Sequence, residues 1–332
     1  MRDYSKKKPF INKQQLWAER NGIRMNENGN NRYFYALNPD ENIFNGLSEE
    51  TRKCFMDADG NELADSENGY PPKMSALHSS SALCVNVFQY FMDKPELACA
   101  LFRSCGLIGD DIKNDDDVKV NKMQFECKDY PINTNPVATP NIDLVADLEF
   151  KGKNLHIIAE SKFTEPYVGE AKNFLSDKYY GKNSAIWREA NLFQLFLALK
   201  TISVIYVDEK GKRTTSGRDE YEKLMKDGKR IRGQFVFPYR YLDAVQLIKH
   251  LLGAALKYQD QENIRLFYVW YDTFDFEGVA HRREIEEFKT FIESNTEAKF
   301  HHITYQDLIR NLSSKLNDEH SAYLNYISDR YL

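Results

Sequence analysis

The sequence predicts an α/β protein in which helices stand on both sides of a group of β-strands. Three strand-like runs follow one another between residues 122 and 163, and stretches with helical spacing come before and after them. In the last third of the chain, strand-like and helix-like stretches alternate. This order favours a sheet covered by helices over an all-α or an all-β protein.

Composition and charge exclude several other classes of protein. Of the 332 residues, 42% are hydrophobic, so the chain can bury a core and is neither disordered nor fibrous. The net charge of −5 excludes a protein that is basic throughout. It is compatible with a nuclease, which needs acidic metal ligands and only a local basic cleft.

The cysteines and the apolar runs indicate the compartment. Five cysteines without a C-x-x-C motif argue against a disulfide framework or a zinc ribbon and predict reduced thiols. The basic start is not followed by an apolar stretch, and no apolar run approaches the length of a membrane span. We therefore expect a cytoplasmic protein that does not associate with membranes.

We expect two parts that pack into one compact unit. Residues 1–74 are rich in Asn and are predicted to form an N-terminal extension with a loop at 26–31. Within this extension, Asp59-Gly60 predicts the turn of a short hairpin. Residues 75–332 are predicted to form the main domain, which ends in helices.

The main domain is expected to begin with two helices. Ser79 caps the first, and Pro95 opens the second, which ends at Gly106. Period-two alternation of apolar and polar residues then predicts three strands, at 122–130, 142–150 and 155–163. The elements expected after them are helices at 185–202, 242–257 and 283–293, strands at 234–239, 264–271 and near 300, and closing helices.

The second and third of these strands carry acidic residues on one face. A two-residue turn at 151–152 would pair Phe150 with Lys153, and the same register places Asp143 directly opposite Glu160. The Cβ atoms of such a pair are about 5 Å apart, so both carboxylates could bind one hard cation. A three-residue turn would instead put the two acids on opposite faces.

A lysine completes a pattern that suits phosphate chemistry. Lys162 lies on the same face as Glu160 and could orient or deprotonate an attacking water, or stabilise charge that develops on the phosphate. The other acid on this face, Asp147, would pair with His156, roughly 13 Å from Glu160 along the strand. The register therefore favours Asp143 over Asp147 as the partner of Glu160.

Asp143, followed by Glu160-Ser161-Lys162 on the next strand, resembles the D…(D/E)-x-K motif of the PD-(D/E)XK nuclease superfamily. Ile142 stands where that motif has its proline. The run ESKFTEPY and the earlier helix HSSSALCVN are similar to a restriction-endonuclease-like branch of uncharacterised bacterial proteins. The resemblance covers residues 75 to 240 and arguably more. It implies a restriction-endonuclease-like core, with a central mixed β-sheet flanked by α-helices, in the domain at 75–332.

The same resemblance implies an activity and assigns residues to it. Members of the superfamily hydrolyse phosphodiester bonds with Mg²⁺ or Mn²⁺. Asp143 and Glu160 would bind the metal together with the backbone carbonyl of Ser161. Asp143, Glu160 and Lys162 would form the catalytic set.

Three further residues are candidates for supporting roles around this set. Glu126 lies on the preceding strand and could add an acid to the cleft. Glu165 follows the motif and could contact Lys162. Gln194, on the helix predicted after the motif, is similar to the glutamine that RecB-like members place near the site.

The sequence thus predicts a metal-dependent endonuclease with DNA as its partner. Two alternatives stay open, a non-catalytic nucleic-acid-binding relic of the same fold and a nuclease that acts on RNA or branched DNA. A homodimer also stays open. Because the net charge is −5, DNA would need a local basic surface, for which the candidates are Lys200, Arg213, Arg218, Lys229, Arg230 and Arg232.

Overall fold

A computed structural model provides the fold of the chain. The residues that it describes are 8–26, 34–58, 60–65, 69, 71–109, 118–128, 141–150, 152–169, 171, 173–176, 179, 185–202, 204–207, 213–216 and 233–332. None of the helices within these ranges is long and apolar enough to cross a membrane.

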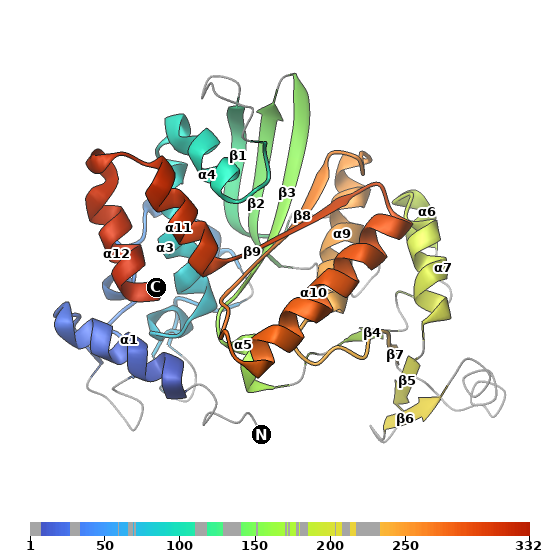
Figure 1. The fold of residues 1–332 in the computed structure, drawn as a ribbon, viewed down its shortest axis with the longest axis horizontal. Helices are drawn as coiled ribbons and strands as arrows, with labels where there is room; N and C mark the ends of the chain where they lie inside the picture. Colours follow the sequence, from blue (N-terminus) through green and yellow to red (C-terminus); the bar gives the residue numbers. More distant parts are fainter. Residues whose placement is uncertain are drawn as a thin grey trace.

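The centre of the molecule is a mixed sheet of five strands in the order β1-β2-β3-β8-β9 (Figure 1). β1, β2 and β3 form an antiparallel meander, and β8 and β9 run parallel to β3. The mixed sheet that the resemblance implies is therefore confirmed. The bounds of the strands are β1 Val118–Cys127, β2 Ile142–Phe150, β3 Lys153–Lys162, β8 Ile264–Trp270 and β9 Lys299–Thr304.

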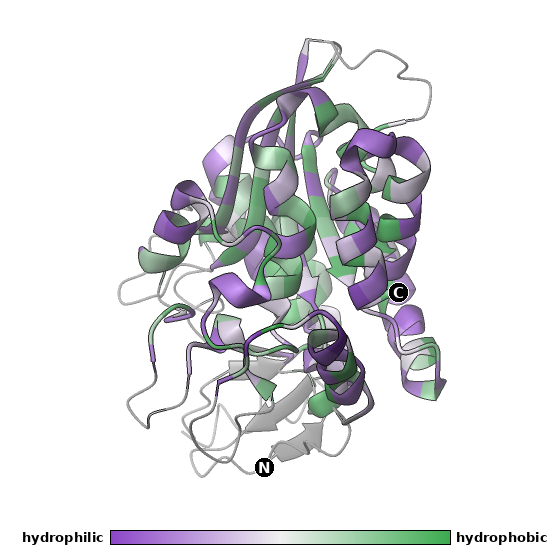
Figure 2. Ribbon diagram, turned by 90° about the vertical axis from the view of Figure 1, so that its left-hand side faces the viewer, coloured by the Kyte–Doolittle hydropathy of each residue, from purple (hydrophilic) through white to green (hydrophobic). Residues whose placement is uncertain are grey.

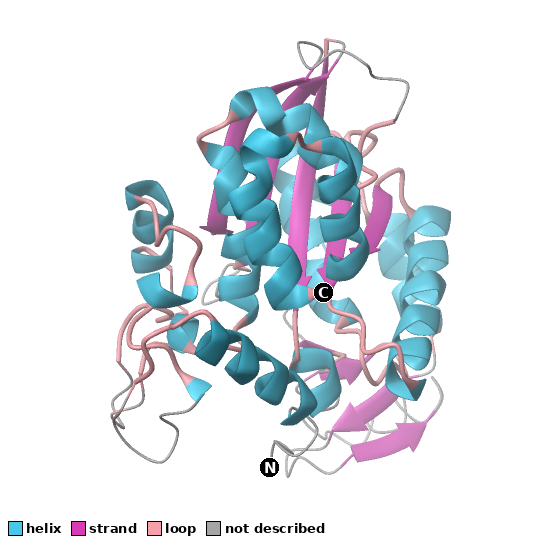
Figure 3. Cartoon of the chain, turned by 60° about the vertical axis from the view of Figure 1, so that its left-hand side comes forward, coloured by secondary structure: helices cyan, strands magenta, loops and turns pink. Residues whose placement is uncertain are grey.

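Helices cover both faces of this sheet (Figure 3). One apolar core lies between the sheet and α3 (Ser80–Met92), α4 (Ala98–Ser104), α11 (Tyr305–Lys315) and α12 (Ser321–Tyr331). The other lies between the sheet and α6 (Ala185–Glu189), α7 (Phe193–Thr201), α9 (Ala244–Tyr258) and α10 (Phe276–Asn295). Both faces of the inner strand β8 are buried, and this strand is apolar along most of its length. The edge strand β1 carries polar, partly exposed residues between Lys119 and Gln124, and Figure 2 shows both hydrophilic and hydrophobic stretches on the strands.

Smaller elements complete the fold. A second sheet has the order β4-β7-β5-β6, with β4 Phe174–Ser176, β5 Val204–Val207, β6 Arg213–Ser216 and β7 Gly233–Phe235. The other helices are α1 (Lys8–Arg20), α2 (Glu49–Met56) and α5 (Glu165–Val168). Short 3-10 helices lie at Asp40–Asn42, Lys73–Ser75, Pro95–Leu97 and Asp318–His320.

Most of the elements expected from the sequence are confirmed. The Ser79 hydroxyl accepts a hydrogen bond from the Ala82 amide and caps α3, and Gly106, with a φ of +72°, follows α4. The predicted strand at 142–150 has the observed bounds. All five cysteines lie in the described ranges and are free thiols, as predicted. The domain boundary at residue 74 stays a prediction.

Two expected elements are wrong. The hairpin around Asp59-Gly60 does not form, because the residues predicted for its first strand are the last residues of the helix α2. The Ser48 side chain caps the start of this helix by accepting a hydrogen bond from the Thr51 amide. Asp59 itself lies outside the described residues. The single helix at 185–202 is two helices, α6 and α7, separated at Asn191, whose φ of +56° interrupts the helical backbone.

A buried arginine joins the two ends of the chain. Arg330 on α12 is fully buried and donates to the Gln14 side chain at 2.9 Å and to the Asn42 carbonyl at 2.8 Å. It also donates to the Tyr326 hydroxyl at 2.7 Å, and its guanidinium lies 4.4 Å from the centre of the Trp17 ring. The predicted N-terminal extension is therefore packed against the C-terminal helix.

Replacing Arg330 should lower the free energy of unfolding. In an Arg330→Leu variant, buried oxygens of Gln14 and Asn42 lose their donor, which should cost about 3 kcal/mol. Urea unfolding followed by circular dichroism measures this difference. Arg310→Leu is the matched control, because Arg310 pairs with Asp307 on the surface and its side chain is 55% exposed. A loss no larger than that of the control would contradict the structural role of Arg330.

Candidate active site

The β2–β3 hairpin has the register that the sequence predicts. Phe150 pairs with Lys153, and Asp147 pairs with His156. The turn between the strands includes Gly152, whose φ is +73°. The last of these pairs is Leu144 with Ala159, so the next position along the two strands sets Asp143 beside Glu160.

Asp143 is fixed directly against the strand that carries Glu160. The backbone amide of Ser161 donates a hydrogen bond of 2.7 Å to Oδ2 of Asp143. The Ser161 side chain points to the other face of the sheet, where its hydroxyl lies 2.6 Å from the hydroxyl of Tyr305. In a β-strand, the N–H and C=O of one residue face the same neighbour, so the Ser161 carbonyl is also directed toward the Asp143 side.

Glu126 extends the pair of acids to a row across three strands. Phe125 pairs with Leu144 and Cys127 with Ile142, which places Glu126 beside Asp143. Glu126 is 8% exposed and accepts a hydrogen bond from the Asn141 side chain. We call Glu126, Asp143 and Glu160 the acid row.

Lys162 is held against the acid row. Its ammonium forms an ion pair with Glu160 and donates to the Gln246 side chain at 3.3 Å. Glu160 is 1% exposed, whereas the Lys162 side chain is 18% exposed. Glu165 also lies close, because its carboxylate accepts a hydrogen bond of 3.0 Å from the Phe163 amide and its charge acts on Lys162.

The helix above Glu160 is α9 and not the helix predicted at 185–202. His250 on α9 is 1% exposed, and its Nδ1 lies 3.3 Å from Oε2 of Glu160. Within the described residues, neither of these two atoms has a hydrogen-bond partner. The imidazole bonds instead to the Asn141 backbone, and burial lowers the pKa of His250 to about 3. His250 is therefore neutral at physiological pH.

The acids of the row raise one another's pKa. Burial raises the pKa of Asp143 well above its usual range, and the charge of Glu160 raises it further. Burial and the charge of Asp143 raise the pKa of Glu126 in the same way. Burial raises the pKa of Glu160 to about 7, against the opposing effect of Lys162. Three carboxylates held this close favour either a shared proton or a bound cation.

Lys162 keeps its charge in this environment. Burial alone would lower its pKa, but the negative charges of Glu160 and Asp143 raise the pKa above the usual value for lysine. Lys162 is therefore an ammonium group at neutral pH and does not act as a general base in this state.

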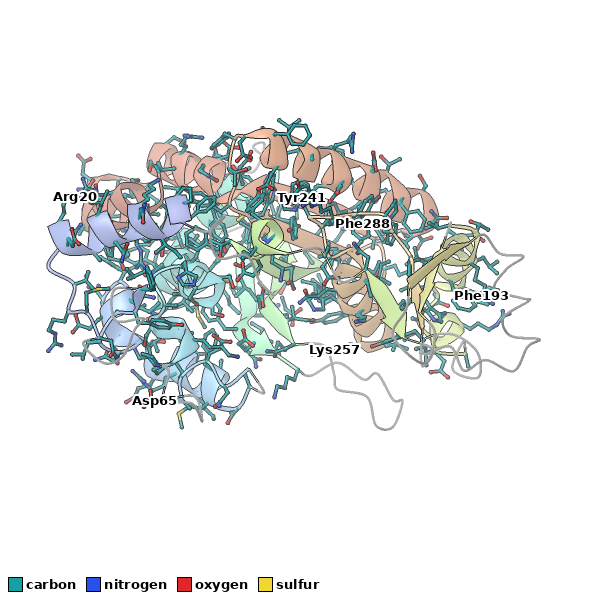
Figure 4. All side chains as sticks on the ribbon, turned by 90° about the horizontal axis from the view of Figure 1, so that it is seen from below. Arg20, Asp65, Phe193, Tyr241, Lys257 and Phe288 are labelled. Carbon is teal, nitrogen blue, oxygen red and sulfur yellow. The ribbon has the colours of Figure 1, made fainter. Side chains whose placement is uncertain are left out.

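Gln194 is not brought to this cluster. It is exposed on α7 and lines a separate pocket with Gln259, Asp260 and Asn295. Its neighbour Phe193 lies at the end of the molecule opposite to Arg20 (Figure 4). The structure thus places Gln194 at a pocket that contains none of the acid row, on a helix that begins after the break at Asn191.

Asp147 belongs to a different cluster on the same strand. Its Oδ1 lies 2.8 Å from Nδ1 of His156 and accepts a hydrogen bond of 2.8 Å from the Tyr258 hydroxyl. Burial would raise the pKa of Asp147, but the bonds from His156 and Tyr258 outweigh burial and lower it. Asp147 is thus bonded to His156 and Tyr258, and its position on β2 lies four residues from Asp143, the neighbour of Glu160.

Two members of the acid row, Asp143 and Glu160, offer the kind of ligand that a small divalent cation prefers. Among the described residues, no group of three or more Asp, Glu, His or Cys side chains is arranged to hold a metal ion. Mg²⁺ in nucleic-acid enzymes commonly uses one or two carboxylates and takes its other ligands from water and substrate phosphates. Asp143 and Glu160 supply two such carboxylates, and Oε2 of Glu160 lacks a hydrogen-bond partner in the described structure although it is buried.

Comparison with known families shows to which family the chain belongs. The model of the family REase-ARP, described as Restriction Endonuclease associating with ARP, matches residues 11–332. The chain belongs to this family. No curated protein and no solved structure gave a significant match. The match covers the acid row and α9, and it extends on both sides of the residues 75 to 240, and arguably more, over which the sequence resembles the restriction endonucleases.

Gln246 and His250 are the residues near the site that the sequence interpretation missed. Both were included in a predicted helix without a functional role. They stand at positions i and i+4 of the stretch VQLIKHLL, whose third polar residue is Lys249, and residues with this spacing lie on one face of a helix. Because His250 and the apolar residues around it are buried, this polar pair marks the face of α9 that meets the acid row.

The Asp147 cluster should contribute stability in a pH-dependent way. The pKa of Asp147 in the folded state lies below the ordinary value for aspartate. The stability that this carboxylate contributes is therefore present above about pH 4 and is lost as the pH falls through the lowered pKa. Asp147→Asn should therefore be about 1–2 kcal/mol less stable than the parent at about pH 5. At about pH 3 the difference should be smaller. Urea unfolding at both values measures it, and a difference that grows with acid would contradict this assignment.

Proposed function

We propose that this protein is a metal-dependent endonuclease that hydrolyses DNA phosphodiester bonds. The observation that supports this proposal is that three side chains lie together at the ends of two paired strands. Asp143 lies beside Glu160 across these strands, and Lys162 forms an ion pair with Glu160. The chain that carries them belongs to the restriction endonuclease family. Asp143 and Glu160 would hold Mg²⁺ or Mn²⁺, with the Ser161 carbonyl as a further ligand. When bound, the cation would polarise a phosphoryl oxygen and lower the pKa of a coordinated water.

Lys162 acts as the electrostatic partner of the phosphate. Its ammonium is charged at neutral pH and is partly exposed, unlike Glu160 beneath it. A fixed positive charge at this place stabilises negative charge that develops on the phosphoryl oxygens during hydrolysis. Gln246 accepts a hydrogen bond from this ammonium and limits the positions it can take.

His250 and Glu126 shape the surroundings of the two proposed ligands. The neutral imidazole of His250 faces Glu160 without adding a second positive charge that would compete with a cation. Glu126 adds a third acidic group beside Asp143, and its pKa is raised to about 8. The acid row therefore holds protons at neutral pH, which a divalent cation would displace by balancing the charge of the carboxylates.

The DNA-binding surface is part of the same proposal. Of the basic candidates, Lys200 is exposed on α7, and Arg213 lies on β6. Arg218, Lys229, Arg230 and Arg232 lie outside the described residues. The homodimer stays a prediction.

Removing a proposed ligand charge should abolish cleavage. Glu160→Gln keeps the size of the side chain but not its charge, so cleavage of duplex DNA in Mg²⁺ should fall by at least about 10²-fold. Lys162→Ala should lose cleavage to a similar degree while it still binds Mn²⁺ in calorimetry, because Lys162 is not a ligand. Gel assays on duplex, single-stranded and RNA substrates measure the activity.

Asp147→Asn is the matched control for these variants. It neutralises an acid on the same strand, but one that bonds to His156 and Tyr258, so cleavage should stay near that of the parent. If Asp147→Asn inactivates and Asp143→Asn does not, the ligand assignment is wrong. A parent protein that binds DNA but cleaves none of the substrates would instead be a binding relic of the fold.

DNA binding should weaken steeply with salt. With a net charge of −5, affinity depends on local contacts between basic side chains and phosphates. Six such contacts predict a loss of about 10³-fold in affinity between about 50 and 200 mM salt. Fluorescence anisotropy with the Glu160→Gln variant measures this dependence without cleavage. Binding that does not respond to salt would argue against phosphate contacts.

A further inference from the structure

A pocket lies beside the acid row, between α2 and the edge strand β1. It has a volume of about 780 Å³, within the range of ligand-binding pockets in proteins. α2 and the end of α3 form one wall, and residues 120–124 of β1, together with Glu126 and Lys128, form the other. In the described sheet, β1 pairs only with β2, so the pocket follows a sheet edge.

Glu126 belongs to both the pocket and the acid row. It lines the pocket, and the strand register places it beside Asp143. Its φ of +49° is unusual for a residue with a side chain, and it breaks the alternation of β1. Phe125 therefore packs into the core with α3, whereas Cys127 packs into the core on the other face. Such a local irregularity changes the direction in which a side chain points. Here the side chain is that of Glu126, which lines the pocket and lies beside the proposed catalytic acids.

The walls of the pocket offer three kinds of contact. Phe91, Met92 and Met123 give it an apolar side. Asn121 and Gln124 add amide groups, which can donate to and accept from the edge of a base. The polar lining residues that carry charge are Lys53, Lys122, Lys128, Glu50, Asp57 and Glu126. The lysines suit phosphate oxygens, and the carboxylates can accept from the exocyclic amine of a base.

We propose that this pocket binds one unpaired nucleotide of the nucleic-acid strand that passes the acid row. The base would lie against Met92 and Met123 with its edge toward Asn121 and Gln124, and Lys122 and Lys128 would contact the flanking phosphates. A base inside a duplex is paired and stacked and cannot enter a pocket in the protein. The inference rests on the proposed nuclease function and adds a preference for single-stranded DNA, or for duplex DNA with an unpaired nucleotide near the cleaved bond.

Cys54 provides a direct probe of this pocket. It lines the pocket and is half-buried, whereas the other four cysteines are buried. Burial raises the pKa of the Cys54 thiol, so labelling is best measured at mildly alkaline pH. In the Glu160→Gln protein, a single-stranded oligonucleotide or a duplex with one unpaired nucleotide should slow maleimide labelling of Cys54 at least about tenfold. A fully paired duplex should not, and Cys54→Ala identifies the labelling that comes from elsewhere.

A second variant tests the pocket without a thiol reagent. Met123→Trp places a larger side chain in the pocket and should weaken binding of the single-stranded oligonucleotide at least about tenfold. Met56→Trp is the matched control, since Met56 lies on α2 but is 71% exposed and does not line the pocket. The circular dichroism spectrum of each variant verifies its fold.

The outcomes separate the pocket from the nuclease function. If anisotropy shows that the oligonucleotides bind and Cys54 is labelled as fast as in the free protein, the pocket proposal is overturned and the nuclease proposal stands. Equal protection by the fully paired duplex would overturn the preference for an unpaired nucleotide. If no oligonucleotide binds or is cleaved, the nuclease proposal itself fails, and the pocket proposal fails with it.

Discussion

The candidate site depends on the register of one β-hairpin. A two-residue turn sets Phe150 opposite Lys153, and every pair that follows along β2 and β3 is fixed by it. A shift by one residue would turn Asp143 and Glu160 to opposite faces of the sheet. The Ser161 amide then holds the Asp143 carboxylate at the place where the backbone pairing ends. The distance between the two acids is therefore a property of the sheet and not of a mobile loop.

Burial gives these acids their chemical character. The face that carries them is covered by α9, so Glu160 is 1% exposed, and its pKa rises to about 7. An acid row of this kind on an exposed strand face would be screened by water and would have nearly ordinary pKa values. Lys162 offsets part of the negative charge, and the divalent cation that we propose would offset the rest. The same packing that builds the apolar core thus raises the pKa values of these acids.

The edge strand β1 connects two parts of the molecule. At Glu126 its backbone departs from a regular strand, and this residue is shared by the acid row and by the pocket against α2. Residues 49–56, which lie in the predicted N-terminal extension, form one wall of that pocket. Arg330 ties the same extension to the last helix through the carbonyl of Asn42. The extension is therefore an integral part of the fold around the site.

The sequence by itself determined the α/β class, the β2–β3 hairpin and the approach of Asp143 to Glu160, because alternation and turn length are local properties. It did not determine which helix covers the acids: it offered Gln194, on the helix predicted at 185–202, as a possible supporting residue, whereas the structure places α9 beside the acids, with Gln246 and His250. The pairing of β3 with β8, across about a hundred residues, and the burial of both sheet faces decide this. Such contacts depend on packing between distant segments, which no local pattern records. The motif could therefore be found in the sequence, whereas the helix and the side chains that cover it could be found only in the tertiary structure.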